Sequence, residues 1–358
     1  MREQTISLLR SLTKAHGVTG SEDEVRNIFR EYVSGEVITD KLGSIYVRRE
    51  GTAAEPSIML SAHLDEVGFV VQSITAEGYI KFISLGGVWG HTVLAQKVRI
   101  STGDKREVIG VVSSKPIHFT TEAERAKVIP IEDMCIDIGA KSAEEAAQKY
   151  GIQIGQPIAF ASDFVNGGDS DIFIAKAFDN RVGVGLVISI ANELLRLNHP
   201  NTVYCGANSQ EEIKGRGAQT AANMVKPDIG IVLEGTPADD FPGSSKDSRQ
   251  GAMGAGVQIR VMDGSTIMNK NLNKFIMGIA EEMKIPYQIT VRRSGGTDAS
   301  LINLNGMGVP VAVLGVPVRY THTANSMIDI NDYFHCHKLL LETFKRLDST
   351  VYHTFITY

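Results

Sequence analysis

The chain has 358 residues, of which 43% are apolar and 22% are charged, and its formal net charge is −5. This length is more than one hydrophobic core usually serves, so we expect one large domain with an insertion, or two domains. The negative net charge and the lack of a long basic block argue against nucleic acid or an anionic membrane as the main partner.

The cysteines and the start of the sequence indicate the compartment. Cys135, Cys205 and Cys336 are widely spaced and form no Cys-x-x-Cys pair, so we expect neither a disulfide framework nor a cysteine-based zinc site. The first residues lack the apolar segment of a secretory signal, and no run of about 18 apolar residues occurs in the sequence. The sequence therefore predicts a cytoplasmic protein without a membrane-spanning helix.

The first elements are predicted to be helices followed by strands. Apolar residues at helical spacing predict helices over residues 6–12 and 25–33. Strands are predicted at residues 42–47 and 57–62, and the second is apolar almost throughout, as expected for a strand buried on both faces. This second strand leads directly into His63-Leu64-Asp65-Glu66.

The pattern changes between residues 69 and 163. This part consists of short alternating segments separated by turn signals such as Gly86-Gly87, with one helical stretch at residues 142–150. We interpret it as a small β-rich domain, inserted into an α/β domain that comprises residues 1–68 and 164–358.

Strands and helices alternate again in the last half of the chain. This alternation predicts a mostly parallel sheet covered by helices on both faces. Helices are predicted to begin near residues 182, 218, 272 and 333, and strands at residues 172–175, 202–207, 229–233, 254–261, 289–291 and 309–314.

Acidic or imidazole side chains lie at or just beyond the ends of several predicted strands. In open α/β sheets, ligands bind in the crevice outside the carboxyl ends of the strands. Each residue alone has an ordinary structural explanation, as a surface side chain, a turn residue or a helix cap. Together at one edge of one sheet they indicate a binding site formed by His63, Asp179, Glu212, Glu234 and His322.

The residue types of this set favour a metal centre. Imidazole and carboxylate ligands suit zinc, cobalt or manganese. Two divalent ions carry a charge of +4, which three carboxylates and one hydroxide balance, and one carboxylate would bridge the ions. Adjacent side chains on an extended segment point to opposite faces, so one of Glu211 and Glu212 is expected to bind metal and the other to act as general base. Asp65 lies on the same side of the strand as His63 and is expected to orient its imidazole.

Several motifs of the chain resemble the TET-type metallo-aminopeptidases, which include glutamyl aminopeptidases and the deblocking aminopeptidases. The resemblance follows the chain in order over nearly its whole length. Its motifs are His63-Leu64-Asp65-Glu66-Val67-Gly68, Phe178-Asp179-Asn180-Arg181, Gln210-Glu211-Glu212-Ile213-Lys214-Gly215-Arg216-Gly217 and Gly295-Gly296-Thr297-Asp298-Ala299, followed by His322.

The resemblance implies a zinc-peptidase-like fold with two divalent ions per subunit, most often zinc. In such a site Asp179 bridges the ions, His63 and Glu234 bind one of them, and Glu212 and His322 bind the other. Glu211 is then the general base, and Asp65 supports His63. Because the family more often has aspartate at the position of Glu234, Asp239 or Asp240 is an alternative ligand.

The resemblance also implies that the inserted domain is PDZ-like and serves in assembly, since family members form dimers that assemble into hollow tetrahedral dodecamers.

The expected activity is removal of N-terminal residues from short peptides. Residues 295–298 are expected to line the pocket, because glycine allows the backbone to approach a ligand closely. Arg292-Arg293 could select acidic side chains through bidentate contacts, although a broad neutral or aliphatic preference is favoured.

Two alternative functions remain at this point. A metal-independent glycoside hydrolase is one, because some family members carry a cellulase label. Such an enzyme needs two carboxylates that flank a sugar bond, and the two histidines of the set and the single tryptophan, Trp89, disfavour it. A non-catalytic metal-binding scaffold is the other, but a structural metal site is normally closed by protein ligands and has no spare base beside it.

Overall fold

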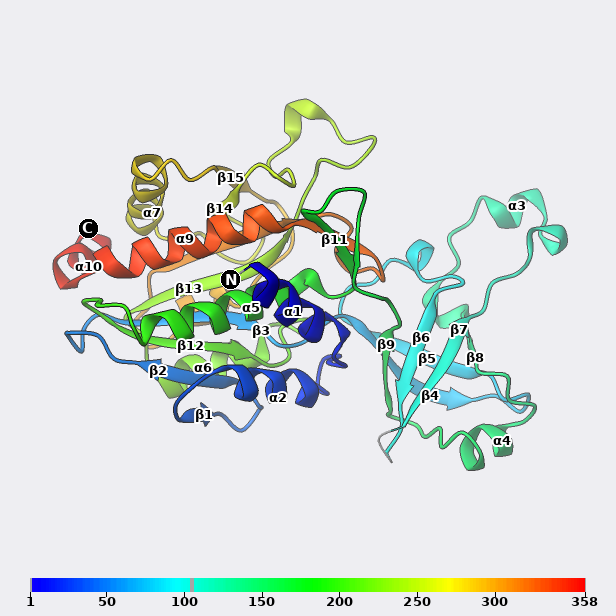
Figure 1. Cartoon of the computed structure of the whole chain (residues 1–358). Coiled ribbons are helices and arrows are strands. Elements are labelled where there is room, and N and C mark those ends of the chain that lie inside the picture. Colours follow the sequence, from blue (N-terminus) through cyan, green and yellow to red (C-terminus); the bar gives the residue numbers. More distant parts are fainter. Residues whose placement is uncertain (1, 104–105, 358) are drawn as a thin grey trace.

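The structure, a computed structural model, describes residues 2–103 and 106–357. An α/β part and a separate β barrel lie side by side in Figure 1. Within the described ranges, no helix combines the length and the apolar character needed to span a lipid bilayer. The helices are α1 (Arg2–Lys14), α2 (Asp23–Tyr32), α3 (Glu122–Arg125), α4 (Ala143–Gln148), α5 (Phe178–Leu194), α6 (Arg216–Val225), α7 (Lys270–Glu282), α8 (Ala299–Asn303), α9 (Ile330–Arg346) and α10 (Ser349–Ile356).

The main sheet is mixed. Among the described residues it has eight strands, in the order β1 (Val37–Thr39), β2 (Ile45–Arg49), β12 (Thr202–Asn208), β3 (Ser57–His63), β13 (Ile229–Pro237), β16 (Val311–Val318), β14 (Val257–Met262) and β15 (Tyr287–Val291). Strands β12, β3, β13 and β16 run parallel to one another, as do β14 and β15. Strand β2 pairs antiparallel with β1 and β12, and β14 pairs antiparallel with β16.

The apolar central strands are explained by burial on both sides. Ile58 and Leu60 of β3 belong to a hydrophobic cluster that also contains residues of α1, α5 and α9. Met59, which points the opposite way because successive strand residues alternate, belongs to a second cluster with residues of α6 and α8. The α/β architecture predicted from the sequence is therefore confirmed.

The inserted β-rich part is a closed antiparallel barrel. Its strand order is β4 (Gly68–Ile74), β5 (Ile80–Leu85), β8 (Ile136–Asp137), β7 (Glu107–Val112), β6 (Lys97–Ser101) and β9 (Pro157–Phe160). Phe69 packs edge to face on Phe82 and Phe160, with ring centroids 4.9 and 5.4 Å apart. These rings give the barrel its own core, so it forms a hydrophobic unit separate from that of the main sheet.

One predicted strand lies outside the main sheet. Residues 172–175 form β11 (Ile172–Ala175), which pairs antiparallel with β10 (Val165–Asn166) and with β17 (Ser326–Asp329) in a small sheet. Only alternate residues of this short strand, Phe173 and Ala175, are fully buried. It therefore lacks the two buried faces of the central strands of the main sheet, such as β3.

A buried ion cluster joins the segment after β3 to β11, α5 and α1. The Lys176 Nζ lies 2.6 Å from a Glu66 carboxylate oxygen and donates to the Ala15 carbonyl oxygen at 3.1 Å. Arg181 lies 3.2 Å from the same Glu66 oxygen and donates to the Leu12 carbonyl oxygen at 2.9 Å. Because the Lys176 and Arg181 side chains are buried, removing Glu66 would leave uncompensated buried charge. The cluster therefore fixes how β11 and α5 sit against the end of β3.

His16 lies beside this cluster and is buried. Its side chain and backbone together are 4% exposed, and neither ring nitrogen has a hydrogen-bond partner in the described structure. Burial lowers the pKa of His16 to about 4, the charge of Glu66 opposes this shift, and Arg99 and Lys176 add to it. His16 is therefore neutral in the folded protein at pH values at which it is protonated in the unfolded chain.

Acidification should consequently destabilise the fold through His16. Between about pH 6.5 and pH 4 the unfolded chain binds a proton that the folded chain does not, so the unfolding free energy falls as the pH falls. The expected loss from pH 7 to pH 4 is about 2–3 kcal/mol for this group. Urea unfolding of the His16→Leu variant should show a pH dependence weaker by that amount. An unchanged dependence would refute the assignment.

Candidate active site

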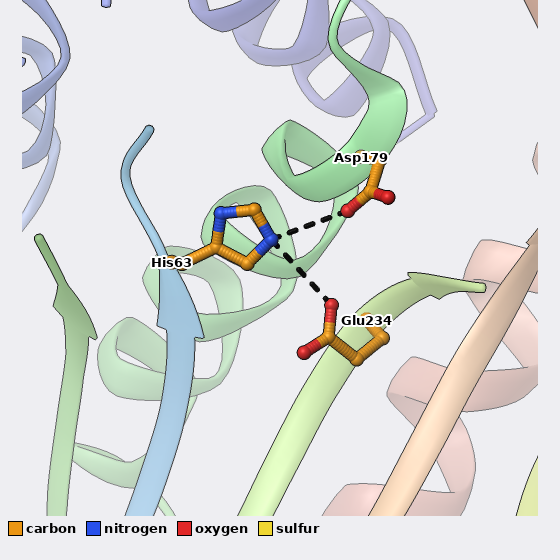
Figure 2. A group of neighbouring side chains, drawn as sticks. All are labelled: His63, Asp179 and Glu234. Atoms are coloured by element: carbon orange, nitrogen blue, oxygen red, sulfur yellow. Dashed lines mark hydrogen bonds and ion pairs between the residues drawn. The ribbon is translucent and has the colours of Figure 1, made fainter. Parts of the chain in front are cut away.

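Three of the predicted ligand residues meet at the end of β3. The Nε2 atom of His63 lies 3.2 Å from Oδ1 of Asp179 and 3.6 Å from Oε2 of Glu234. Figure 2 shows one ring nitrogen of His63 facing both carboxylates, which come from the start of α5 and from β13. His63 is the last residue of its strand, so its side chain enters the crevice beyond the sheet.

Two further predicted ligands complete the cluster on the other side of Asp179. The Nε2 atom of His322 lies 3.4 Å from Oδ2 of Asp179 and 3.3 Å from Oε1 of Glu212. Asp179 therefore faces His63 with one carboxylate oxygen and His322 with the other. This is the arrangement that a carboxylate bridging two cations requires.

Asp65 holds the loop that carries the two glutamates. The backbone amides of Glu211 and Glu212 donate to its two carboxylate oxygens at 2.9 and 3.1 Å, and the hydroxyl of Thr19 donates to one of them at 2.7 Å. The carboxylate of Glu211 then lies 4.0 Å from Nε2 of His63. The two adjacent glutamates thus both reach the cluster from one fixed loop.

Main-chain oxygens orient both imidazoles. The Nδ1 atom of His63 lies 3.0 Å from the main-chain oxygen of Asp65, and Nδ1 of His322 lies 2.7 Å from that of Gly87. A carbonyl oxygen only accepts, so Nδ1 carries a hydrogen in both rings and it is Nε2 that faces the cluster. For His63 this contact is shorter than the 3.5 Å from Nδ1 to the Asp65 carboxylate. Asp65 therefore orients the imidazole, as predicted, but through its main-chain carbonyl oxygen.

The start of α5 is held directly on β13. The side-chain amide of Asn180 donates to the Glu234 carboxylate at 3.0 Å and to the Leu233 carbonyl oxygen at 2.7 Å, and it accepts from the Gly235 amide at 3.1 Å. A Cβ on Gly235 would lie 2.8 Å from Cα of Asp179. Glycine at this position therefore lets the Asp179 backbone pack against the strand that carries Glu234.

Glu234 lies inside β13 and not at its end. The sequence predicts that the strand ends at residue 233, but pairing with β16 continues through Pro237. The two alternative ligands lie elsewhere. The Asp239 carboxylate accepts from the Gly251 amide at 2.8 Å, and Asp240 forms an ion pair with Arg319.

Electrostatics of the cluster favour a cationic guest. Burial raises the pKa of Glu212 to about 8, although the charge of His322 lowers it. Burial likewise raises the pKa of Asp298 to about 7, although the charge of His63 lowers it. Burial also raises the pKa of Glu211 well above its ordinary value. Oε1 of Glu234 and Oδ1 of Asp298 are buried without a hydrogen-bond partner among the described residues. Buried carboxylates of this kind are paired or bind metals, so the residues present fit divalent cations.

Histidine and aspartate at the centre of the cluster are already charge-paired. Burial would lower the pKa of His322, but its contacts with Asp179 and the charge of Glu212 raise it to about 9. Burial would raise the pKa of Asp179, but His322 and His63 hold it well below its ordinary value. Asp179 is therefore ionised, as a shared metal ligand must be.

A cavity of about 490 Å³ opens onto the cluster. Gly295, Gly296 and Thr297 line it as predicted, whereas Asp298 accepts a hydrogen bond from the side chain of Asn208 at 2.9 Å. Sequence reasoning did not identify several other lining residues, because nothing in the local pattern marks them, although Lys214 lies within one motif and Ser294 and Ser300 flank another. They are Lys214, Thr236, Pro237, Arg260, Ser265, Ser294, Ser300 and Leu301.

Known proteins have a similar sequence and the same fold. A lysyl aminopeptidase from Pyrococcus furiosus is 34% identical over 353 residues, which cover 96% of this chain and 98% of that protein. A TET aminopeptidase from a marine-sediment thaumarchaeote is 38% identical, with a TM-score of 0.94 and coverage of 99% of both chains. The TET1 peptidase of Pyrococcus horikoshii, which can assemble into a tetrahedron or a large octahedral shell, is 26% identical with a TM-score of 0.85, covering 96% of this chain and 100% of that one.

The family described as M42 glutamyl aminopeptidase matches residues 43–339. This range contains all of the clustered residues described above and the whole barrel. The resemblance that the sequence motifs indicate is thereby confirmed: the chain belongs to the M42 glutamyl aminopeptidase family and is a peptide hydrolase.

Proposed function

We propose that this protein is a metal-dependent aminopeptidase that removes N-terminal residues from short peptides. The single observation that carries the proposal is the Asp179 carboxylate between two imidazoles, with one oxygen 3.2 Å from His63 and the other 3.4 Å from His322. His63 and Glu234 would hold one divalent ion, Glu212 and His322 would hold the other, and Asp179 would contact both.

Zinc fits this donor set best, and cobalt or manganese also fit. When bound, such ions would supply Lewis-acid activation of the peptide carbonyl and of a water molecule. Glu211 acts as the general base. It takes the proton of the attacking water on a carboxylate oxygen and delivers it to the nitrogen of the leaving amine. Burial of Glu211 suits this role, because a raised pKa brings a carboxylate closer to the pH at which it both accepts and donates a proton.

Replacing Glu211 by glutamine should separate catalysis from metal binding. Glu211→Gln keeps the shape of the side chain but removes the base, so kcat should fall by about 10²–10⁴-fold. Both ions should still bind, measured by metal analysis after desalting. Glu36→Gln, an exposed glutamate remote from the cluster, is the matched control. Turnover near that of the unaltered enzyme in metal-loaded Glu211→Gln would remove Glu211 from this role.

Metal removal should abolish activity. After EDTA treatment, release of amino-acid p-nitroanilides should stop, and zinc, cobalt or manganese should restore it. The reason is that His63, Glu212, Glu234 and His322 bring their ligand atoms together as a metal site would. Full activity after verified removal of metal would contradict the proposal. Cleavage of β-linked glucose oligosaccharides without metal would favour the glycoside hydrolase, and metal uptake without any hydrolysis would favour the scaffold.

The cavity suits an acidic N-terminal side chain. Arg260 and Arg292 both line it, and the Nε atoms of both are buried without a hydrogen-bond partner among the described residues. Arg260 is compensated by Asp263 at 3.0 Å, whereas the hydrogen bonds of Arg292 to the described residues go to the neutral oxygens of Pro237 and Gln258, at 2.7 and 3.2 Å. Burial lowers the pKa of Arg292, with Asp239 opposing this shift and Arg260 adding to it. A substrate carboxylate would compensate this partly buried positive charge.

The side-chain preference can be tested on p-nitroanilides of glutamate, leucine and lysine. The unaltered enzyme should prefer glutamate and reject lysine. Arg292→Met should lower kcat/KM for glutamate by about 10–100-fold, equivalent to about 1.4–3 kcal/mol, with little change for leucine. Arg293→Met is the matched control, because Arg293 is exposed and does not line the cavity. Equal losses for glutamate and leucine would rule out recognition of the acidic group by Arg292.

We further infer that residues 69–163 form an assembly domain of the PDZ-like kind and that copies of the chain associate, as the Pyrococcus horikoshii TET1 peptidase does. The barrel exposes large apolar side chains in support of this inference. Phe119 is 71% exposed, Trp89 63% and Ile117 61%. Exposed apolar side chains that form one contiguous patch are typical of association surfaces.

A further inference from the structure

The barrel also reaches the metal cluster. The turn after β5 carries Gly86-Gly87, and it is followed by the short helix η1 (Gly90–Thr92). Both glycines lie next to cluster residues that come from the α/β part: Gly86 next to Glu212 and Gly87 next to His322. The inserted domain therefore contributes two backbone positions to a site whose side chains all belong to the other domain.

Gly87 determines which nitrogen of His322 faces the cluster. Its carbonyl oxygen accepts a hydrogen bond from Nδ1 at 2.7 Å, so Nε2 points to Asp179 and Glu212. The His322 side chain is 35% exposed and follows β16 on a turn. Its ring is held less by burial than that of His63, whose side chain is 2% exposed. The barrel carbonyl is therefore the contact that orients this imidazole.

Gly86 lies against Glu212 so closely that a side chain does not fit. A Cβ at this position would lie 2.7 Å from Cγ1 of Val67, 3.0 Å from Oε2 of Glu212 and 3.2 Å from Cβ of Glu212. At 2.7 Å the Val67 methyl group must move, and at 3.0–3.2 Å the Glu212 side chain must give by a few tenths of an ångström. The Gly86 backbone thus packs closely against the Glu212 side chain and limits where its carboxylate can lie.

We propose that the Gly86-Gly87 turn of the barrel positions Glu212 and His322, and that it is required for tight binding of the ion that these two residues hold. This inference rests on the proposed function. The other ligand pair is positioned without the barrel, His63 by the Asp65 carbonyl and Glu234 by Asn180. Disturbing the turn should therefore weaken one of the two ions and leave the other bound.

The test is a zinc titration by calorimetry of Gly86→Ala and of Gly155→Ala, each in the full chain. Gly155 is a matched control, because it also lies in the barrel, has nearly the same positive φ (+87° against +83°), and a Cβ there would meet nothing within 4 Å. Gly86→Ala should bind one zinc with unchanged affinity and the second at least tenfold more weakly. Its kcat should fall more than its KM rises, and Gly155→Ala should bind both ions as the unaltered protein does.

A second variant distinguishes the effect of a clash with Glu212 from that of a clash with Val67. Val67→Ala/Gly86→Ala removes the methyl groups that would clash first, restoring folding if the single variant is unstable, and leaves the new Cβ facing Glu212. It should show the same selective loss of one ion, and Val67→Ala alone should not. Two tightly bound ions in both Gly86 variants, or an equal loss in Gly155→Ala, would overturn the inference. Failure of the unaltered protein to bind two ions would overturn the proposed function instead.

Discussion

Repulsion among buried carboxylates is the constraint on which the rest of this structure depends. Asp179, Glu211, Glu212 and Glu234 face one another at the end of the main sheet, and two imidazoles compensate only part of their charge. Buried charges persist only when they are paired or bind metal. The fold therefore uses strong local restraints to keep these side chains converged, and Asp65, Asn180 and Gly235 supply most of them through backbone contacts.

The restraints come from elements that are distant in the sequence. Asp65 follows β3 and holds the loop after β12, Asn180 begins α5 and holds β13, and the buried ion pair of Glu66 and Lys176 ties the segment after β3 to β11. Each contact crosses between strands or between sheets. The cluster is consequently held from several elements at once, which suits a site that must keep charge in a fixed geometry.

The inserted barrel and the α/β part meet at this site. The barrel has its own hydrophobic core, yet its Gly86-Gly87 turn contacts Glu212 and His322. The proposed association surface lies on the same barrel. The pocket lining combines the carboxylates of the cluster with two positive side chains, Arg260 and Arg292. This combination fits the proposed preference for an acidic N-terminal side chain.

The sequence alone determined the features that depend on local pattern. The alternation of strands and helices, the β-rich insertion and the peptidase family followed from periodicity and from motifs such as His63-Leu64-Asp65-Glu66 and Gln210-Glu211-Glu212. Periodicity reports only which faces of an element are buried. It could not show that β11 joins a separate sheet, or that Glu234 lies inside β13, because strand pairing is decided by partners far along the chain.

Only the tertiary structure decided the contacts made by atoms without a sequence signal. The carbonyl oxygens of Asp65 and Gly87 orient the two imidazoles, although every residue has a carbonyl and nothing in the sequence distinguishes these two. Arg260 reaches the pocket from β14, while Arg293, beside Arg292, turns to the solvent. The physical reason is the same in each case: such contacts depend on the packing of whole elements against one another, and a side chain's neighbours in space are then not its neighbours in sequence.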